Sequence, residues 1–333
     1  MTSLSRPKLI ISALALAALA AAALSPQLLG AHVASAFGVL RGAERHWLLL
    51  AAAGFVGAFA CTVGAWRAAL QAAGGRICPK QAAARLAIGS MVNSFAPAKL
   101  GDAVKVALCA KAIDAPGSLW TTGGVYAALA ATRSLLLAAL LVVAFATGAM
   151  PLWPVFVILA AVGALAVAAA LSGRIRRHKH VAQMLEGFAA LERSPRALAA
   201  VLGWSAGMML CRLAATMAVA AALDIPHPAL AALLILPALD VASAFPLTPG
   251  SIGIGSGAVA VALSSRGIGM TDALGVGFAI QAVETLVSVT AGSLGVLYLA
   301  STPTIRRWSL RVATVGASVG VAAAFGLFML DVI

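Results

Sequence analysis

Polar groups gather in one short stretch of an otherwise apolar chain, residues 93–105, which read NSFAPAKLGDAVK. Its polar side chains are those of Asn93, Lys99, Asp102 and Lys105. Because Pro97 interrupts the stretch, we expect a helix to begin near Leu100, with Gly101 allowing another group to approach its backbone. The free N–H groups at a helix start favour anions, and the two lysines add formal positive charge. The stretch therefore predicts a binding site for an anionic headgroup such as a phosphate.

A second interpretation of the same residues needs no bound ligand. Lys99 and Lys105 would be cytoplasmic residues whose ammonium groups reach the phosphates of surrounding lipids. Asp102 would then be an ordinary acid in the first turn of a helix, where negative charge is favourable. The sequence leaves both interpretations open.

A related motif lies later in the chain, at residues 248–257 (TPGSIGIGSG). Residues 97–101 (PAKLG) and 249–253 (PGSIG) share the pattern P-x-x-[LI]-G. The second copy carries no charge, but it offers backbone N–H groups and small hydroxyls to the same ligand. Its candidate binding residues are Pro249, Gly250, Ser251, Gly253 and Ser256.

Four ionisable residues fall within apolar stretches, where an uncompensated charge is costly. They are Arg133, Arg212, Asp240 and Glu284. Their signs allow either arginine to pair with either acid, so we expect pairing. Such pairs would either tie parts of the chain together or relay a proton or substrate.

The composition excludes a soluble protein. Hydrophobic residues make up 62% of the 333 residues, charged residues only 10%, and the mean hydropathy is +1.02. Long apolar runs, without alternating segments of about ten residues, predict an all-α polytopic membrane bundle rather than a β-barrel. The net charge of +13 fits basic loops on the cytoplasmic side, so no nucleic-acid partner is expected. The four cysteines form no C-x-x-C motif, so we expect no metal, disulfide framework or cofactor.

Apolar runs of sufficient length predict seven full spans. These lie near residues 9–29, 47–69, 119–148, 152–172, 197–223, 273–299 and 310–331. Two further stretches, 82–112 and 228–265, are apolar but broken near their centres by proline and glycine.

Most of the 23 lysines and arginines lie in segments that would share one side of the membrane. The positive-inside rule then places the N-terminus in the cytoplasm and the C-terminus outside. This orientation requires each broken stretch to enter and leave from the same side, as a re-entrant helix pair. We expect residues 1–30 to form an extra, uncleaved N-terminal helix, although ASA at 34–36 resembles a signal-peptide cleavage site.

The two broken stretches divide the chain, which we expect to be a single integral membrane domain over residues 1–333, into similar halves. Residues 47–172 and 197–331 contain the same order of full and broken spans in opposite orientations. This arrangement predicts an inverted repeat, which is typical of secondary transporters.

The two motifs resemble those of the lysylphosphatidylglycerol-synthase transmembrane-region family of flippase-like proteins. The family pattern N-x-x-x-P-x-x-x-G-[DE]-x-x-[KR] is matched from Asn93 to Lys105. The second family motif is matched at Pro249, Gly250 and Gly253. Ser251 replaces a usual glycine and Ser256 a usual glutamate, so Asp240 or Glu284 would have to supply any acid needed there.

The resemblance implies a multi-pass protein of the bacterial inner membrane that moves lipids between leaflets, with membrane lipids as its partners. The chain has no G-x-x-x-x-G-K-[ST] motif, so ATP is not expected to drive transport directly. After Tyr298 only a short basic loop and one helix remain, so lysyl transfer is not expected. Two alternatives remain: an integral-membrane enzyme acting on a lipid-linked phosphate or sugar, and a non-catalytic partner of lipid-synthesis enzymes.

Overall fold

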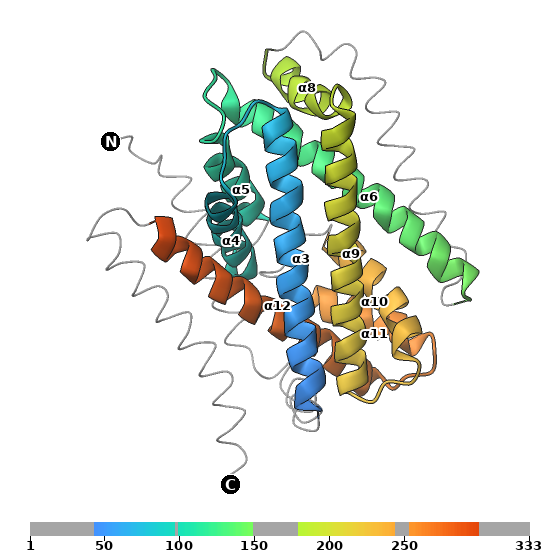
Figure 1. The fold of residues 1–333 in the computed structure, drawn as a ribbon. Helices are drawn as coiled ribbons and strands as arrows, with labels where there is room; N and C mark the ends of the chain where they lie inside the picture. The colour runs from blue at the N-terminus through green and yellow to red at the C-terminus, as the bar shows by residue number, and fades with distance from the viewer. Residues whose placement is uncertain (1–42, 97–98, 149–178, 244–252, 300–333) are drawn as a thin grey trace, which may run out of the picture.

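The computed structural model describes residues 43–96, 99–148, 179–243 and 253–299, and all of its regular elements in these ranges are helices (Figure 1). The helices are α3 (Arg45–Ala72), α4 (Pro79–Phe95), α5 (Leu100–Ala110), α6 (Ser118–Ala146), α8 (Lys179–Glu192), α9 (Pro195–Ala222), α10 (Pro228–Ala242), α11 (Ile254–Ser264) and α12 (Met270–Leu299). The all-α prediction is therefore confirmed for the part of the chain that the structure describes.

Four helices, α3, α6, α9 and α12, are long and apolar enough to cross a membrane. They confirm the spans predicted at 47–69, 119–148, 197–223 and 273–299. The other three predicted spans lie outside the described residues. Several large apolar side chains on these helices are exposed, among them Leu49, Leu210 and Leu294. Such exposure suits contact with lipid tails and would be unfavourable in water.

Each broken stretch forms a pair of short helices. The first pair is α4 and α5, and the second is α10 and α11. Ala96 has φ −92° and ψ 139°, the extended conformation that a residue preceding a proline favours. The chain turns through Lys99, whose φ of 53° is unusual for a residue other than glycine, and α5 begins at Leu100 as the sequence predicts.

Helices α3 and α9 pack side by side in opposite directions at the centre of the molecule (Figure 1). The backbone N–H of Glu44, which precedes α3, donates to the carbonyl of Ala222 at the end of α9 at 3.1 Å. Small residues allow close contact along the pair: a Cβ added to Gly54 would lie 2.9 Å from the Cβ of Ala215. Between membrane helices, such close van der Waals packing is the main source of association.

The last long helix that the structure describes in each half packs on the broken helix pair of the other half. Helix α12 contacts α4 as well as α11, and α6 contacts α10 as well as α5. Gly292 and Gly295 let α12 approach the backbone of α4 at Ala87 and Ala84. The two broken pairs are therefore held between α6 and α12.

Helix α8 lies in a segment that the sequence analysis treated as a connection between spans. It packs on α6 through glycines: a Cβ on Gly124 would lie 2.0 Å from the carbonyl oxygen of Met184, and one on Gly187 would lie 2.2 Å from that of Thr121. Apolar residues recur along α8 at a helical spacing, a signal that could have predicted it.

A candidate anion-binding cavity between the two helix breaks

A polar cavity of about 280 Å³ lies where the two broken helix pairs meet α6, α9 and α12. Its lining includes Ser90, Asn93, Ser94, Lys99, Asp102, Lys105, Arg133, Arg212, Asp240, Ser243, Gly255, Gln281, Glu284, Thr285 and Ser288. These residues come from both halves of the chain. The structure thus brings the charged stretch of residues 93–105 together with the four ionisable residues of the apolar stretches.

Asp102, in the first turn of α5, accepts hydrogen bonds from three helices. Asn93 of α4 donates to Oδ1 at 2.8 Å, and Tyr126 of α6 donates to Oδ2 at 2.9 Å. Lys105, one turn later on α5, forms an ion pair with Oδ1 at 3.0 Å. In the sequence, Asp102 lies three residues after Lys99 and three residues before Lys105. The structure pairs it with Lys105 and shows no side-chain cap on α5.

Lys99 lines the cavity and is exposed at the start of α5. Its ammonium group has no ion-pair partner among the described residues. It also stands beside the free N–H groups of the first turn of α5, whose partial positive charge adds to its own. Lys99 is therefore the cation of the first helix break that remains available to an anion, because Asp102 already occupies Lys105.

Gly101 does not line the cavity but makes the arrangement around Asp102 possible. A Cβ at this position would lie 2.0 Å from the carbonyl oxygen of Gly89 and 2.4 Å from Oδ1 of Asn93. Only a residue without a side chain allows α5 to approach α4 so closely. This contact places Asp102 within reach of Asn93.

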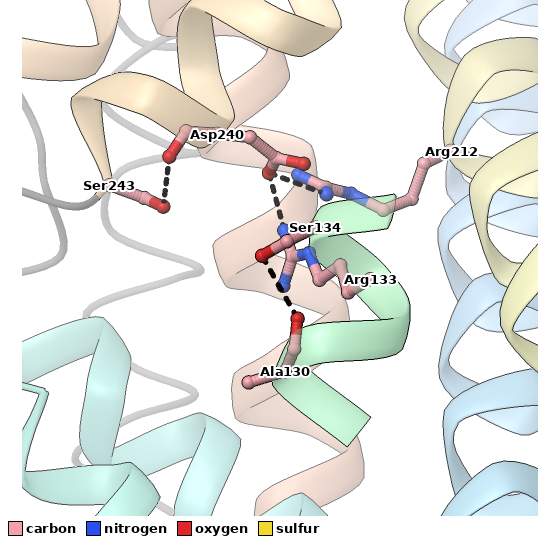
Figure 2. Close-up of polar contacts among 6 residues, drawn as sticks. All are labelled: Ala130, Arg133, Ser134, Arg212, Asp240 and Ser243. Atoms are coloured by element: carbon pink, nitrogen blue, oxygen red, sulfur yellow. Dashed lines mark hydrogen bonds and ion pairs between the residues drawn. The ribbon is translucent and has the colours of Figure 1, made fainter. Parts of the chain in front are cut away.

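Asp240, on α10, binds two arginines from other helices (Figure 2). Arg212 of α9 donates through Nη1 to Oδ1 at 2.8 Å, and Arg133 of α6 donates through Nη2 to the same oxygen. The structure thus pairs both arginines with Asp240. Glu284 of α12 also lines the cavity and attracts Arg212 electrostatically, but forms no ion pair with a described residue.

Among the described residues of the second helix break and of α11 that follows it, Gly255 lines the cavity. Pro249, Gly250 and Ser251 lie outside the described residues, as does Pro97 of the first break. Gly253 precedes α11, with φ 98°. Ser256 is fully buried: its hydroxyl donates to the carbonyl of Gly253 at 3.2 Å and its backbone packs against Gly277 of α12. Among the residues of α11, the cavity lining takes Gly255 in place of the predicted Ser256.

Several uncharged polar residues of the site were not predicted from the sequence. They are Ser90, Ser94, Tyr126, Ser243, Gln281, Thr285 and Ser288. Three of them, Gln281, Thr285 and Ser288, recur on α12 with spacings of four and three residues, which puts them on one face of a helix. Because this polar face lies on an otherwise apolar helix, these three residues could have been predicted as site residues from the sequence. Tyr126 had no such signal, because only the fold brings it to Asp102.

The chemistry of the site is electrostatic binding. Guanidinium and ammonium groups, serine and threonine hydroxyls and amide groups bind phosphate-like anions well. Among the described residues, no group of three or more His, Cys, Asp or Glu side chains could hold a metal ion.

Comparison with known families agrees with a membrane protein. The family model described as "Lysylphosphatidylglycerol synthase TM region" matches residues 8–292, which is most of the chain. No curated protein matches the sequence.

Proposed function

This chain belongs to the lysylphosphatidylglycerol synthase TM region family, and we propose that it is a lipid translocator that moves phospholipids with anionic headgroups between membrane leaflets. The chain is an integral membrane protein, and its family relates it to lipid synthesis and flipping. We place it in the bacterial inner membrane, with membrane lipids as its partners. The headgroup would enter the cavity between the helix breaks while the acyl chains remain in the bilayer.

The charge of the cavity is the observation that carries this proposal. Among the described residues, four cations line it, Lys99, Lys105, Arg133 and Arg212, against three carboxylates, those of Asp102, Asp240 and Glu284. The excess is one positive charge, and Lys99 is the cation without an ion-pair partner among the described residues. An unpaired cation in a polar cavity within an apolar bundle favours an anionic group, because the low dielectric strengthens their attraction.

An inverted repeat would let this cavity open alternately to the two leaflets. Three features of the described residues support it. Helices α3 and α9, the first described helix of each half, run antiparallel, and a broken helix pair follows each of them. The last described helix of each half, α6 or α12, then packs across to the other half. Secondary transporters with this design place substrate sites near the midplane, between discontinuous helices. We propose that the two helix pairs are re-entrant and enter from opposite sides.

The basic residues set the proposed orientation. Of the five described lysines and arginines outside the helices, three lie in the connections after α3, after α5 and before α9, namely Arg76, Lys111 and Arg193. These connections would therefore face the cytoplasm. The N-terminus would then be cytoplasmic and the C-terminus external, and the complete bundle would have seven spans.

Transport fits the site better than catalysis. Acid–base catalysis on a lipid-linked substrate would need an acid and a base that are both free to exchange a proton. Asp102 and Asp240 are both engaged by cations, and they lie on different helix pairs. Among the described residues of the lining, Glu284 is the carboxylate without an ion pair, and no second unengaged acid or histidine lines the cavity beside it. We therefore propose that the protein is not an enzyme and that Asp102 and Asp240 organise the cations.

A leaflet-exchange assay tests the proposed function. Purified protein in liposomes should accelerate the movement of fluorescent phosphatidylglycerol between leaflets, measured as the fraction quenched by external dithionite. Lys99→Gln should slow exchange about tenfold, the loss expected for one charge-assisted contact of about 1.4 kcal/mol. Lys111→Gln is the matched control, because Lys111 is exposed at the other end of α5 and lies outside the cavity lining.

The control variant should exchange lipid at the wild-type rate. Exchange no faster than in protein-free liposomes would refute the proposed function. Equal rates for wild-type protein and Lys99→Gln would refute the role of the cavity, even if lipid still moved.

A further inference from the structure

The two arginines that share Asp240 come from different halves of the chain (Figure 2). Arg212 lies on α9, which directly precedes α10 in the sequence, whereas Arg133 lies on α6 in the first half. Helices α6 and α10 are also in contact. The Arg133–Asp240 ion pair therefore ties the two halves together inside the cavity, and the Arg212–Asp240 ion pair lies within one half.

The two arginines differ in their exposure. The side chain of Arg212 is 12% exposed and that of Asp240 only 5%, but that of Arg133 is 43% exposed. A guanidinium that is nearly half exposed is more easily separated from its partner than a buried one, because water or a ligand can replace the lost contact. Arg133 is thus the exchangeable partner, and Arg212 the permanent one.

The second carboxylate oxygen of Asp240 lowers the free-energy cost of losing Arg133 as a partner. Both arginines donate to Oδ1, while Oδ2 is buried without a hydrogen-bond partner among the described residues. A guanidinium can bind both oxygens of one carboxylate at once. If Arg133 left, Arg212 could turn to engage Oδ2 as well as Oδ1, and Asp240 would not become an uncompensated buried charge.

On the basis of the proposed function, we propose that Arg133 is a headgroup ligand that exchanges partners during transport. The phosphate of an anionic headgroup, which unlike that of phosphatidylcholine has no ammonium group beside it to balance its charge, takes the guanidinium of Arg133 from Asp240. A guanidinium matches phosphate oxygens as well as it matches a carboxylate. Loss of the Arg133–Asp240 ion pair removes the charged contact between α6 and α10, so that their apolar packing alone must hold them. Headgroup binding is thereby coupled to separation of the two halves.

Distance measurements between spin labels on α6 and α10 test this coupling. The labels would be placed at Ser134→Cys and Val241→Cys, exposed positions next to Arg133 and Asp240, in a protein whose four native cysteines are replaced by serine. In nanodiscs of phosphatidylcholine alone we expect one short distance. Adding phosphatidylglycerol should shift part of the distribution to a longer distance.

Substitutions at Arg133 separate the exchange from a merely structural role. Arg133→Gln should show the longer distance without phosphatidylglycerol, since the ion pair is already lost. Arg133→Lys keeps the charge but not the two-pronged geometry, so it should keep the short distance and need more phosphatidylglycerol to lengthen it. Arg196→Gln, at an exposed arginine at the start of α9, should behave as wild type. Gel filtration of each variant shows whether it is folded.

A distance that phosphatidylglycerol does not change, or one that is the same in Arg133→Gln as in wild type, would overturn the inference. If lipid still moves between leaflets under those conditions, the proposed function stands and the partner exchange of Arg133 is refuted. If the distances shift as expected but no lipid crosses the bilayer, the partner exchange of Arg133 stands and the proposed function is refuted.

Discussion

Asp102 holds three helices together with one carboxylate, because its donors Asn93, Lys105 and Tyr126 come from α4, α5 and α6. Two of these partners, Asn93 and Lys105, could have been predicted from the sequence, because they are close to Asp102 along the chain. The contact of Tyr126 could not have been predicted, because nothing in the neighbouring sequence indicates a polar contact. We interpret Asp102 as a structural organiser that occupies Lys105 and so leaves Lys99 to the ligand.

Replacing Asp102 with asparagine tests this role. Asp102→Asn keeps the shape of the side chain but removes its charge, so the three contacts lose about 1.5–3 kcal/mol in the folded state, the range for hydrogen bonds to a charged group. The midpoint of thermal unfolding in detergent, followed by tryptophan fluorescence, should fall by several degrees. The same substitution at Asp114, which is exposed in the loop after α5, is the matched control and should leave the midpoint unchanged. An unchanged midpoint in Asp102→Asn would contradict the role.

The helix breaks show which parts of the elements a sequence can predict. The positions of the breaks follow from local chemistry, because Pro97 forces Ala96 into an extended conformation and α5 restarts at Leu100. Which side of each short helix faces the cavity does not follow from the local sequence. Ser256 was expected at the ligand, but it is buried against Gly277 of α12, and Gly255 lines the cavity.

Glycine substitutions test the packing of the first broken pair. Gly101→Ala would put a Cβ 2.0 Å from a backbone oxygen of α4, so α5 must move away from Asn93. We expect a loss of about 1–3 kcal/mol in stability, as for an overpacked core, together with loss of lipid exchange. Gly257→Ala is the matched control on α11, where an added Cβ meets nothing within 4 Å. If both variants were equally stable in thermal unfolding, the close α4–α5 contact would be wrong.

At the scale of the whole molecule, the charge pattern and the order of spans predicted two similar halves, and the described helices are compatible with that prediction. The sequence could not show that the halves are interlocked, with α12 on α4 and α6 on α10, because such contacts depend on the shapes of surfaces distant in sequence. This interlocking matters for function. It puts cations from both halves around one cavity, so a movement between the halves must change the site.

The most direct test of the account is whether one cavity position can be reached from both sides of the membrane. Ser94→Cys, in a protein without its native cysteines, places a thiol in the cavity lining. Leu210→Cys, at an exposed apolar position on a spanning helix, is the control and should react from neither side. We predict that a charged, membrane-impermeant thiol reagent labels Ser94→Cys both in right-side-out and in inverted vesicles, and that phosphatidylglycerol slows the labelling. Labelling from one side only, with no protection by lipid, would contradict a cavity that carries headgroups across the bilayer.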